Sequence, residues 1–135
     1  MSVHFTPGID LIDYELSRNS LKRGESLVLM LYWQAMQPID RDYTVFLHLV
    51  DQDGNMIAGI DGQPVLGRSP TSTWKPGKLV VDAIVLPIEE DVVAKSNCRL
   101  EIGLYHAPTM ERLSLIDANG SILNDHVIID SIRIQ

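Results

Sequence analysis

The sequence has few of the features that mark metal-binding, nucleic-acid-binding or membrane-spanning proteins. It contains 135 residues and a single cysteine, Cys98, which excludes an intrachain disulfide and a cysteine-based zinc site. Its formal net charge is -7, and no basic cluster exceeds the pair Lys22 and Arg23, so we expect no nucleic-acid partner. No apolar run approaches the ~20 residues that cross a bilayer.

Catalytic motifs are also absent. No serine lies in a Gly-x-Ser-x-Gly turn, and no histidine pair has the spacing of a zinc protease helix. The four histidines lie far apart in the sequence, at His4, His48, His106 and His126. We therefore predict that this chain is not itself an enzyme, and that it holds no cofactor and no metal.

In place of these motifs, the sequence has short segments in which every second residue is apolar. Turn-forming Gly, Pro, Asn and Asp residues separate them, as expected for strands of a sandwich. The pattern predicts an all-β fold, a two-layer antiparallel β-sandwich of the immunoglobulin-like or jelly-roll-like kind, with about eight or nine strands in one domain spanning residues 1–135. The predicted strands are Ile9–Leu16, Leu27–Gln34, Tyr43–Val50, Met56–Ile60, Val80–Leu86, Asn97–His106, Arg112–Ile116 and Val127–Ile134.

The cleaner face of each strand predicts the core, because a sheet buries alternate residues. Trp33 and Cys98 fall on such faces, so we expect both to be buried. The full predicted core consists of Leu29, Leu31, Trp33, Val45, Leu47, Leu100, Ile102 and Leu104.

The segment Asp51–Asn55 has two interpretations. Its Asp-Gly pair between alternating strands is typical of a hairpin turn. Its oxygen-bearing side chains at alternate positions also resemble the start of a calcium loop, although the later glutamate of such a loop is missing.

Two strands are apolar on both faces, which is unusual in an antiparallel sheet. If these strands pair, Val28, Met30 and Tyr32 share a face with Phe46 and Val50. We expect either the long loop Gly59–Gly77 to cover this face or a partner to dock on it. The candidate ligand or interface residues are therefore Trp74, Tyr32, Met30, Phe46 and His48.

Trp74 lies in that loop, between Pro70 and Pro76. A loop of this length without secondary structure is uncommon in a compact domain, so it should either pack or function. Trp74 is accordingly either a plug that closes the sandwich or an exposed platform on which a sugar stacks.

Nine segments of the sequence match one known kind of module: Gly24–Leu27, Leu31–Ala35, Asp40–Leu49, Asp51–Gly54, Asp61–Pro64, Pro70–Gly77, Val81–Asp82, Ile102–Tyr105 and Glu111–Leu113. They resemble a C-terminal β-sandwich module of bacterial polytopic membrane proteins, which are glycosyltransferase-like proteins of the protein mannosyltransferase type. The resemblance implies an extracytoplasmic accessory domain, with the membrane-embedded portion of a parent protein or a second copy as partner. The alternative is a carbohydrate-binding module that recognises a cell-surface glycan.

The chain departs from this pattern at one strand and the turn after it. Asn97 and Cys98 stand where the family has a Gly-x-Tyr entry, His106 replaces an Asp, and Met110 replaces a Gly. No catalytic residue of such a transferase maps onto the chain.

Overall fold

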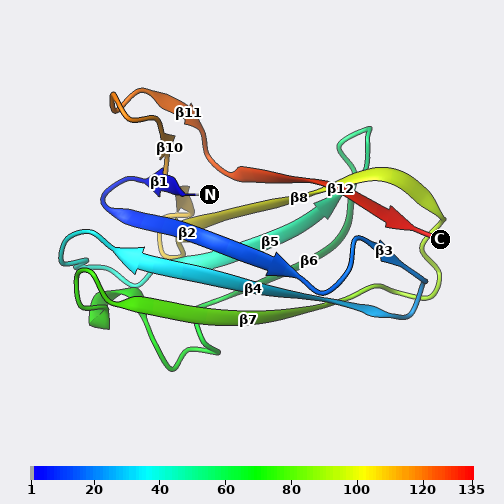
Figure 1. The fold of residues 1–135 in the computed structure, drawn as a ribbon, viewed down its shortest axis with the longest axis horizontal. Coiled ribbons are helices and arrows are strands. Elements are labelled where there is room, and N and C mark those ends of the chain that lie inside the picture. Colours follow the sequence, from blue (N-terminus) through cyan, green and yellow to red (C-terminus); the bar gives the residue numbers. More distant parts are fainter. Residues whose placement is uncertain (1) are drawn as a thin grey trace.

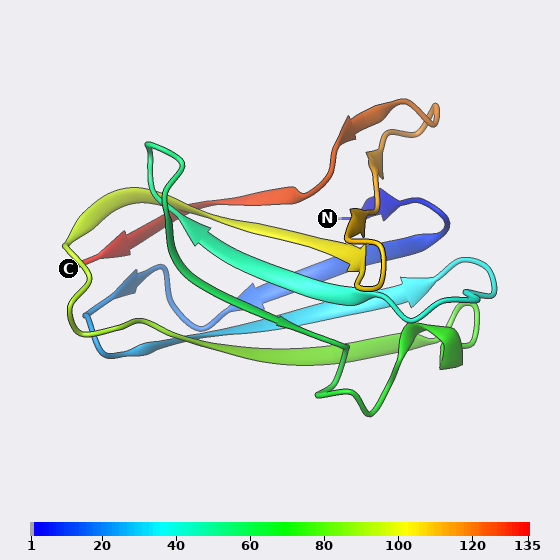
Figure 2. The same ribbon diagram turned by 180° about the vertical axis from the view of Figure 1, so that it is seen from behind.

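The structure, a computed structural model, describes residues 2–135, except for the side chain of Asp130. These residues form two sheets packed face to face (Figures 1 and 2). The predicted β-sandwich is therefore confirmed. The one helical element among the described residues is a single 3-10 turn, η1, at Thr71–Thr73.

Each sheet combines long strands with short ones of two or three residues. Sheet A has the order β11 (Ile122–Asn124), β10 (Leu115–Ile116), β1 (Val3–Phe5), β2 (Ile9–Leu16), β4 (Ser26–Ala35) and β7 (Leu79–Pro87). Sheet B has the order β3 (Ser20–Leu21), β12 (Val127–Ile134), β8 (Lys95–His106), β5 (Thr44–Val50) and β6 (Met56–Gly62), with β9 (Glu111–Arg112) paired to β8.

The long alternating segments form strands as predicted, and their bounds agree within two residues. The short ones do not follow the prediction. The strand predicted at Arg112–Ile116 is two strands, because β9 pairs with β8 in sheet B while β10 pairs with β1 in sheet A. The chain crosses between the sheets at this point. The pattern did not predict β1, β3 or β11, each of which has two or three residues.

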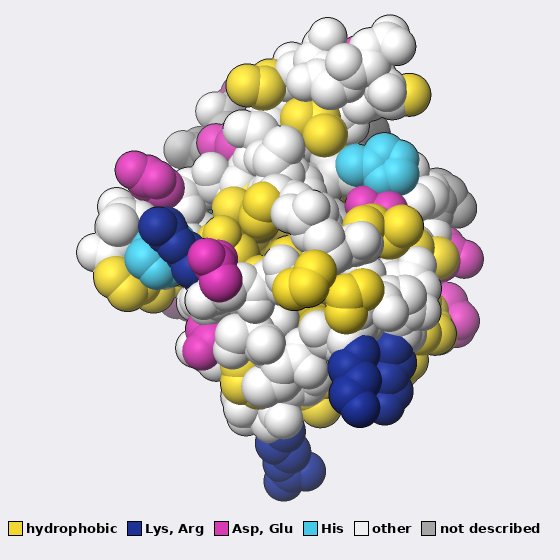
Figure 3. Space-filling view, turned by 90° about the vertical axis from the view of Figure 1, so that its left-hand side faces the viewer, with side chains coloured by type: hydrophobic (Ala, Val, Ile, Leu, Met, Phe, Trp, Pro, Cys, Tyr) yellow, Lys and Arg dark blue, Asp and Glu magenta, His cyan; other side chains and the backbone are white. Residues whose placement is uncertain are grey.

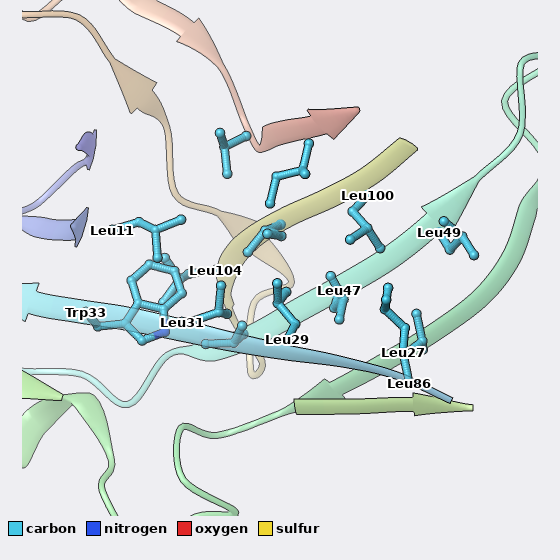
Figure 4. Close-up of a cluster of buried hydrophobic side chains, with 14 of the residues drawn as sticks. Leu11, Leu27, Leu29, Leu31, Trp33, Leu47, Leu49, Leu86, Leu100 and Leu104 are labelled. Carbon is cyan, nitrogen blue, oxygen red and sulfur yellow. The ribbon is translucent and has the colours of Figure 1, made fainter. Parts of the chain in front are cut away.

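The core lies between the inner faces of the two sheets (Figure 4). All eight residues of the predicted core are buried there, and so is Cys98. The rings of Phe5 and Trp33 pack in this core with centroids 6.2 Å apart. The Trp33 ring nitrogen is buried without a hydrogen-bond partner among the described residues, which costs ~1–3 kcal/mol.

Two tight turns share one design. The Asp51 carboxylate accepts hydrogen bonds from the backbone N–H groups of Asp53 and Asn55, each at 2.9 Å. Asp117 accepts the same pair of bonds from Asn119 and Ser121, also at 2.9 Å. In both turns, the fourth residue is a glycine with a positive φ. The prediction of a hairpin turn at Asp51–Asn55 is thus confirmed, and Oδ1 of Asp51 already accepts two backbone hydrogen bonds.

None of the described residues forms a helix long and apolar enough to span a membrane.

Replacing Ile102 by Ala should lower the free energy of unfolding by ~2–5 kcal/mol, because the truncation leaves a cavity in the middle of the core. Urea denaturation measures this loss. Ile122→Ala is the matched control, since Ile122 is 72% exposed and its truncation should change stability by less than about 0.5 kcal/mol. Equal effects of the two substitutions would show that the register of β8 is wrong.

Candidate functional site

The five residues predicted as ligand or interface positions lie in three separate regions. Strand β4 pairs with β2 and β7, while β5 pairs with β6 and β8. The expectation that Val28, Met30 and Tyr32 share a face with Phe46 and Val50 is therefore wrong. The first group lies on the outer face of sheet A and the second on the outer face of sheet B. Sequence patterns show which residues alternate but do not show which strands are neighbours.

Trp74 lies inside the sandwich. It is 5% exposed, and its ring centroid lies 6.4 Å from that of Trp33. Its ring N–H donates a 2.9 Å hydrogen bond to the backbone carbonyl of Ser69. Trp74 thus closes the end of the core as a plug, and it presents no exposed ring to a sugar.

The loop that carries Trp74 does not cover the outer face of sheet A. Strand β6 continues to Gly62, so the loop begins later than predicted. Thr71 anchors the loop: its hydroxyl accepts a 2.9 Å hydrogen bond from the backbone N–H of Tyr43. The backbone N–H of Val65 donates a 2.9 Å hydrogen bond to the carboxylate of Asp82 in β7. The loop therefore packs along the end and one edge of the sandwich, and the outer face of sheet A stays uncovered by it.

The outer face of sheet A is apolar along two paired strands. Val28, Met30 and Tyr32 of β4 lie opposite Val85, Ala83 and Val81 of β7. The β7 members are exposed and the β4 members are half-buried. Tyr32 donates a 2.8 Å hydrogen bond to Glu15 of β2, which raises the pKa of the Tyr32 hydroxyl and marks the polar border of the face.

The outer face of sheet B is polar and aromatic. The Arg112 guanidinium lies 4.2 Å from the centroid of the Phe46 ring, which is 1% exposed. Beneath the ring is Gly103, where an added Cβ would lie 2.4 Å from a Phe46 ring carbon. Only glycine allows the ring to lie so close to β8. Phe46 is therefore a covered packing residue.

His48 stands beside this ring, with centroids 5.0 Å apart, and its Nε2 lies 3.5 Å from Asp61 of β6. Tyr105 donates a 2.9 Å hydrogen bond to the other oxygen of Asp61, and this bond raises the pKa of the Tyr105 hydroxyl. His48, Asp61 and Tyr105 thus form a hydrogen-bonding cluster open to solvent.

A second chain of charges follows along the same face. His126 lies between two carboxylates, with Nδ1 2.6 Å from Asp125 and Nε2 3.3 Å from Glu101. Arg112 also contacts Asp125, at 3.3 Å. These pairs hold the turn before β12 against β8. The ionisable side chains of Glu101, Asp125 and His126 are thus engaged with one another.

The cysteine thiol lacks the surroundings that activation as a nucleophile needs. Cys98 is buried in the core, and burial raises the pKa of its thiol, so the reactive thiolate is disfavoured. No group of three or more His, Cys, Asp or Glu side chains among the described residues could hold a metal ion. At one end of the sandwich, basic and acidic side chains are scattered around apolar ones without a patch of one sign (Figure 3).

Sequence analysis missed a fourth region, a cleft between the edge strands β6 and β7. The cavity has a volume of about 590 Å³, and Asp82 of β7 is one of its lining residues. Asp82 lies opposite Leu31 in the register and shares the inner face of the sheet. The available signal was Asp82 itself, the one charged residue in the otherwise apolar strand predicted at Val80–Leu86.

Comparisons with known proteins support the fold. The crystal structure of the C-terminal domain of Wzt is similar over 98% of this chain and 77% of that chain, with a TM-score of 0.63 and 16% sequence identity. The structure of a β-glucuronidase from glycoside hydrolase family 2 is less similar, with a TM-score of 0.47 and 12% sequence identity. The similarity covers 84% of this chain and 12% of that chain. No protein-family model and no curated protein matches the sequence.

The first likeness is to a domain of Wzt rather than to a mannosyltransferase-type protein. The resemblance to glycosyltransferase-like membrane proteins therefore stays a prediction from the sequence. What the likeness shows is the β-sandwich architecture.

Replacing Trp74 by Ala should destabilise the protein by ~3–5 kcal/mol, because it removes the plug and leaves a cavity beside Trp33. Urea denaturation measures the loss. Native fluorescence should be blue-shifted in the wild type, since both tryptophans are buried. An unchanged melting temperature in Trp74→Ala would contradict the plug role.

Proposed function

We propose that this chain is a non-catalytic interaction module, the extracytoplasmic part of a glycosyltransferase-like membrane protein. Its partner is the membrane-embedded portion of that parent protein, and it docks through the outer face of sheet A. The observation that carries the proposal is the uncovered apolar surface formed by the paired strands β4 and β7.

This surface has the composition of an interface. Its members bear no formal charge, whereas Asp13 and Glu15 of the neighbouring strand β2 place two carboxylates on the same outer face of sheet A. Monomeric proteins rarely expose contiguous apolar patches beyond a few hundred Å², and larger ones mark contact sites. The surface comprises Val28, Met30, Tyr32, Leu79, Val81, Ala83 and Val85.

Other features agree with a module of a larger protein. The similar Wzt structure is itself that of a C-terminal domain. The titratable side chains on the outer face of sheet B are engaged in ion pairs and hydrogen bonds with one another, as in His126 with Glu101 and Tyr105 with Asp61. Interaction through the face of sheet A needs no catalytic group.

Cysteine labelling tests the docking. In Val81→Cys, the introduced thiol lies on the apolar face and is the reactive one, because the native Cys98 is buried. A maleimide should modify it readily in the isolated chain. In the full-length parent protein, labelling should slow by about tenfold or more, since a docked partner excludes the reagent.

Val93→Cys is the matched control. Val93 is also exposed but lies outside this face, in the connection between β7 and β8. Its labelling rate should be the same in the isolated chain and in the parent protein. Equal rates for Val81→Cys in both contexts would refute docking through sheet A.

A second candidate function is glycan binding, which the cluster of His48, Asp61 and Tyr105 favours. Hydroxyl, imidazole and carboxylate groups side by side can donate and accept hydrogen bonds with sugar hydroxyls. The burial of Trp74 removes the stacking platform that the sequence suggested.

A glycan array decides this second candidate. Binding should be specific and should fall at least about tenfold in Tyr105→Ala, while Tyr32→Ala on sheet A serves as the control and keeps it. A wild-type chain that binds no glycan above background removes glycan recognition from consideration.

A further inference from the structure

The cleft between β6 and β7 is a pocket with aliphatic walls. Its volume of about 590 Å³ lies within the ~300–1,000 Å³ usual for small-molecule sites. Val45, Ile60 and Ile84 supply apolar surface from both sheets. The pocket exists because β6 and β7 are the free edges of their sheets on the same side of the sandwich, so no strand closes the gap between them.

Asp82 is a charged group built into this apolar pocket. It is 4% exposed. One of its oxygens, Oδ1, accepts a 2.9 Å hydrogen bond from the backbone N–H of Val65. No other described residue donates a hydrogen bond to this carboxylate. Burial raises the pKa of Asp82, with the bond from Val65 opposing the effect, which indicates that its negative charge is poorly compensated.

The charge of the pocket has one sign. Asp61 is the other ionisable residue among the described residues that line it, and the lining includes no Lys, Arg or His. Asp61 already contacts His48 and Tyr105 on the outer face of sheet B. Asp82 is thus the carboxylate left to interact with a group inside the cleft.

The rim of the pocket holds strained backbone. Val65 and Leu66 have φ values of 56° and 54°, which L-residues rarely adopt, and β-branched residues least of all. Such strain persists only where the surrounding structure fixes it, and here Asp82 fixes Val65. Leu66 is 88% exposed, although it lines the mouth of the pocket. An apolar occupant would give this side chain a contact.

We propose that the cleft between β6 and β7 binds an alkylammonium group, such as that of a small amine or of a lysine side chain. The ammonium donates hydrogen bonds to Asp82, and the alkyl stem packs between Ile60 and Ile84 under Leu66. A cation compensates the buried charge and meets the carboxylate as a charge-assisted hydrogen bond. The cleft borders the apolar face of sheet A at Ala83 and Val85, but recognition of a cation by Asp82 does not rest on the docking proposed there.

Asp82 also has a purely structural role to be distinguished from binding. An inward-pointing charge on an edge strand hinders pairing with other chains, and this carboxylate also anchors the loop. In Asp82→Asn, the side-chain oxygen can still accept the bond from Val65, while the charge is gone. This variant therefore separates anchoring from recognition of a cation.

The experiment is a titration of the ¹⁵N-labelled chain followed by NMR, with hexylammonium, hexanol and hexanoate as probes. Hexylammonium should shift the Val65 amide, whose hydrogen bond reports directly on Asp82, and should bind about tenfold tighter than hexanol. Hexanoate should not bind. In Asp82→Asn, the affinity for hexylammonium should fall to within about twofold of the affinity for hexanol.

Asp61→Asn is the matched control, since it removes the other carboxylate of the lining and should leave hexylammonium affinity within about twofold of wild type. Acetyl-lysine-amide, with a free side-chain amine, is the probe for a protein source of the cation, and shifts at Val65 with either amine support the site. Equal binding of hexanol and hexylammonium, equal losses in Asp61→Asn and Asp82→Asn, or shifts that avoid Val65 and β7 would overturn the proposal.

Discussion

The burial of one face of β4 against the opposite sheet is the interaction on which the rest of the structure depends. Every second residue of this strand, from Leu27 through Trp33 to Ala35, has no exposed surface. Each large side chain so buried contributes ~1.5–3 kcal/mol. Because β4 pairs with β2 on one side and β7 on the other, this single apolar stripe fixes the positions of both neighbours and the outward direction of Met30 and Tyr32.

A β-sandwich buries the inner faces of its two sheets against each other, but it leaves apolar side chains at the open edges less well covered. At the side formed by β6 and β7, the inner faces end without a strand to join them. The chain handles this gap with a loop that Asp82 and Thr71 tie down, at the cost of one desolvated carboxylate and two residues with positive φ. The edge is therefore where apolar surface, buried charge and backbone strain occur together.

The sequence was sufficient for features that depend on neighbouring residues. The long strands followed from alternation, and the turn at Asp51–Asn55 followed from an aspartate and a glycine three positions later. Strand order depends on contacts between distant segments, so the pairing assumed for β4 and β5 was wrong. For Trp74, the sequence left two interpretations open, a buried plug and an exposed platform for a sugar. Asp82 was missed because the sequence does not show which face of the strand Val80–Leu86 points inward or that this strand lies at an open edge.

The two outer faces of the molecule differ in kind, and this difference follows from what each sheet has beside it. Sheet B is joined by β9 and by the turn before β12. Strand β9 brings Arg112 over the Phe46 ring, the turn brings Asp125 into contact with Arg112, and Phe46 is thereby covered. Sheet A receives no such cover on β4 and β7. The same alternating pattern thus gives sheet B a polar outer face, whose charged groups pair with one another, and gives sheet A an apolar outer face on β4 and β7. The docking that we propose would cover the apolar face of sheet A and leave the polar face of sheet B in contact with water.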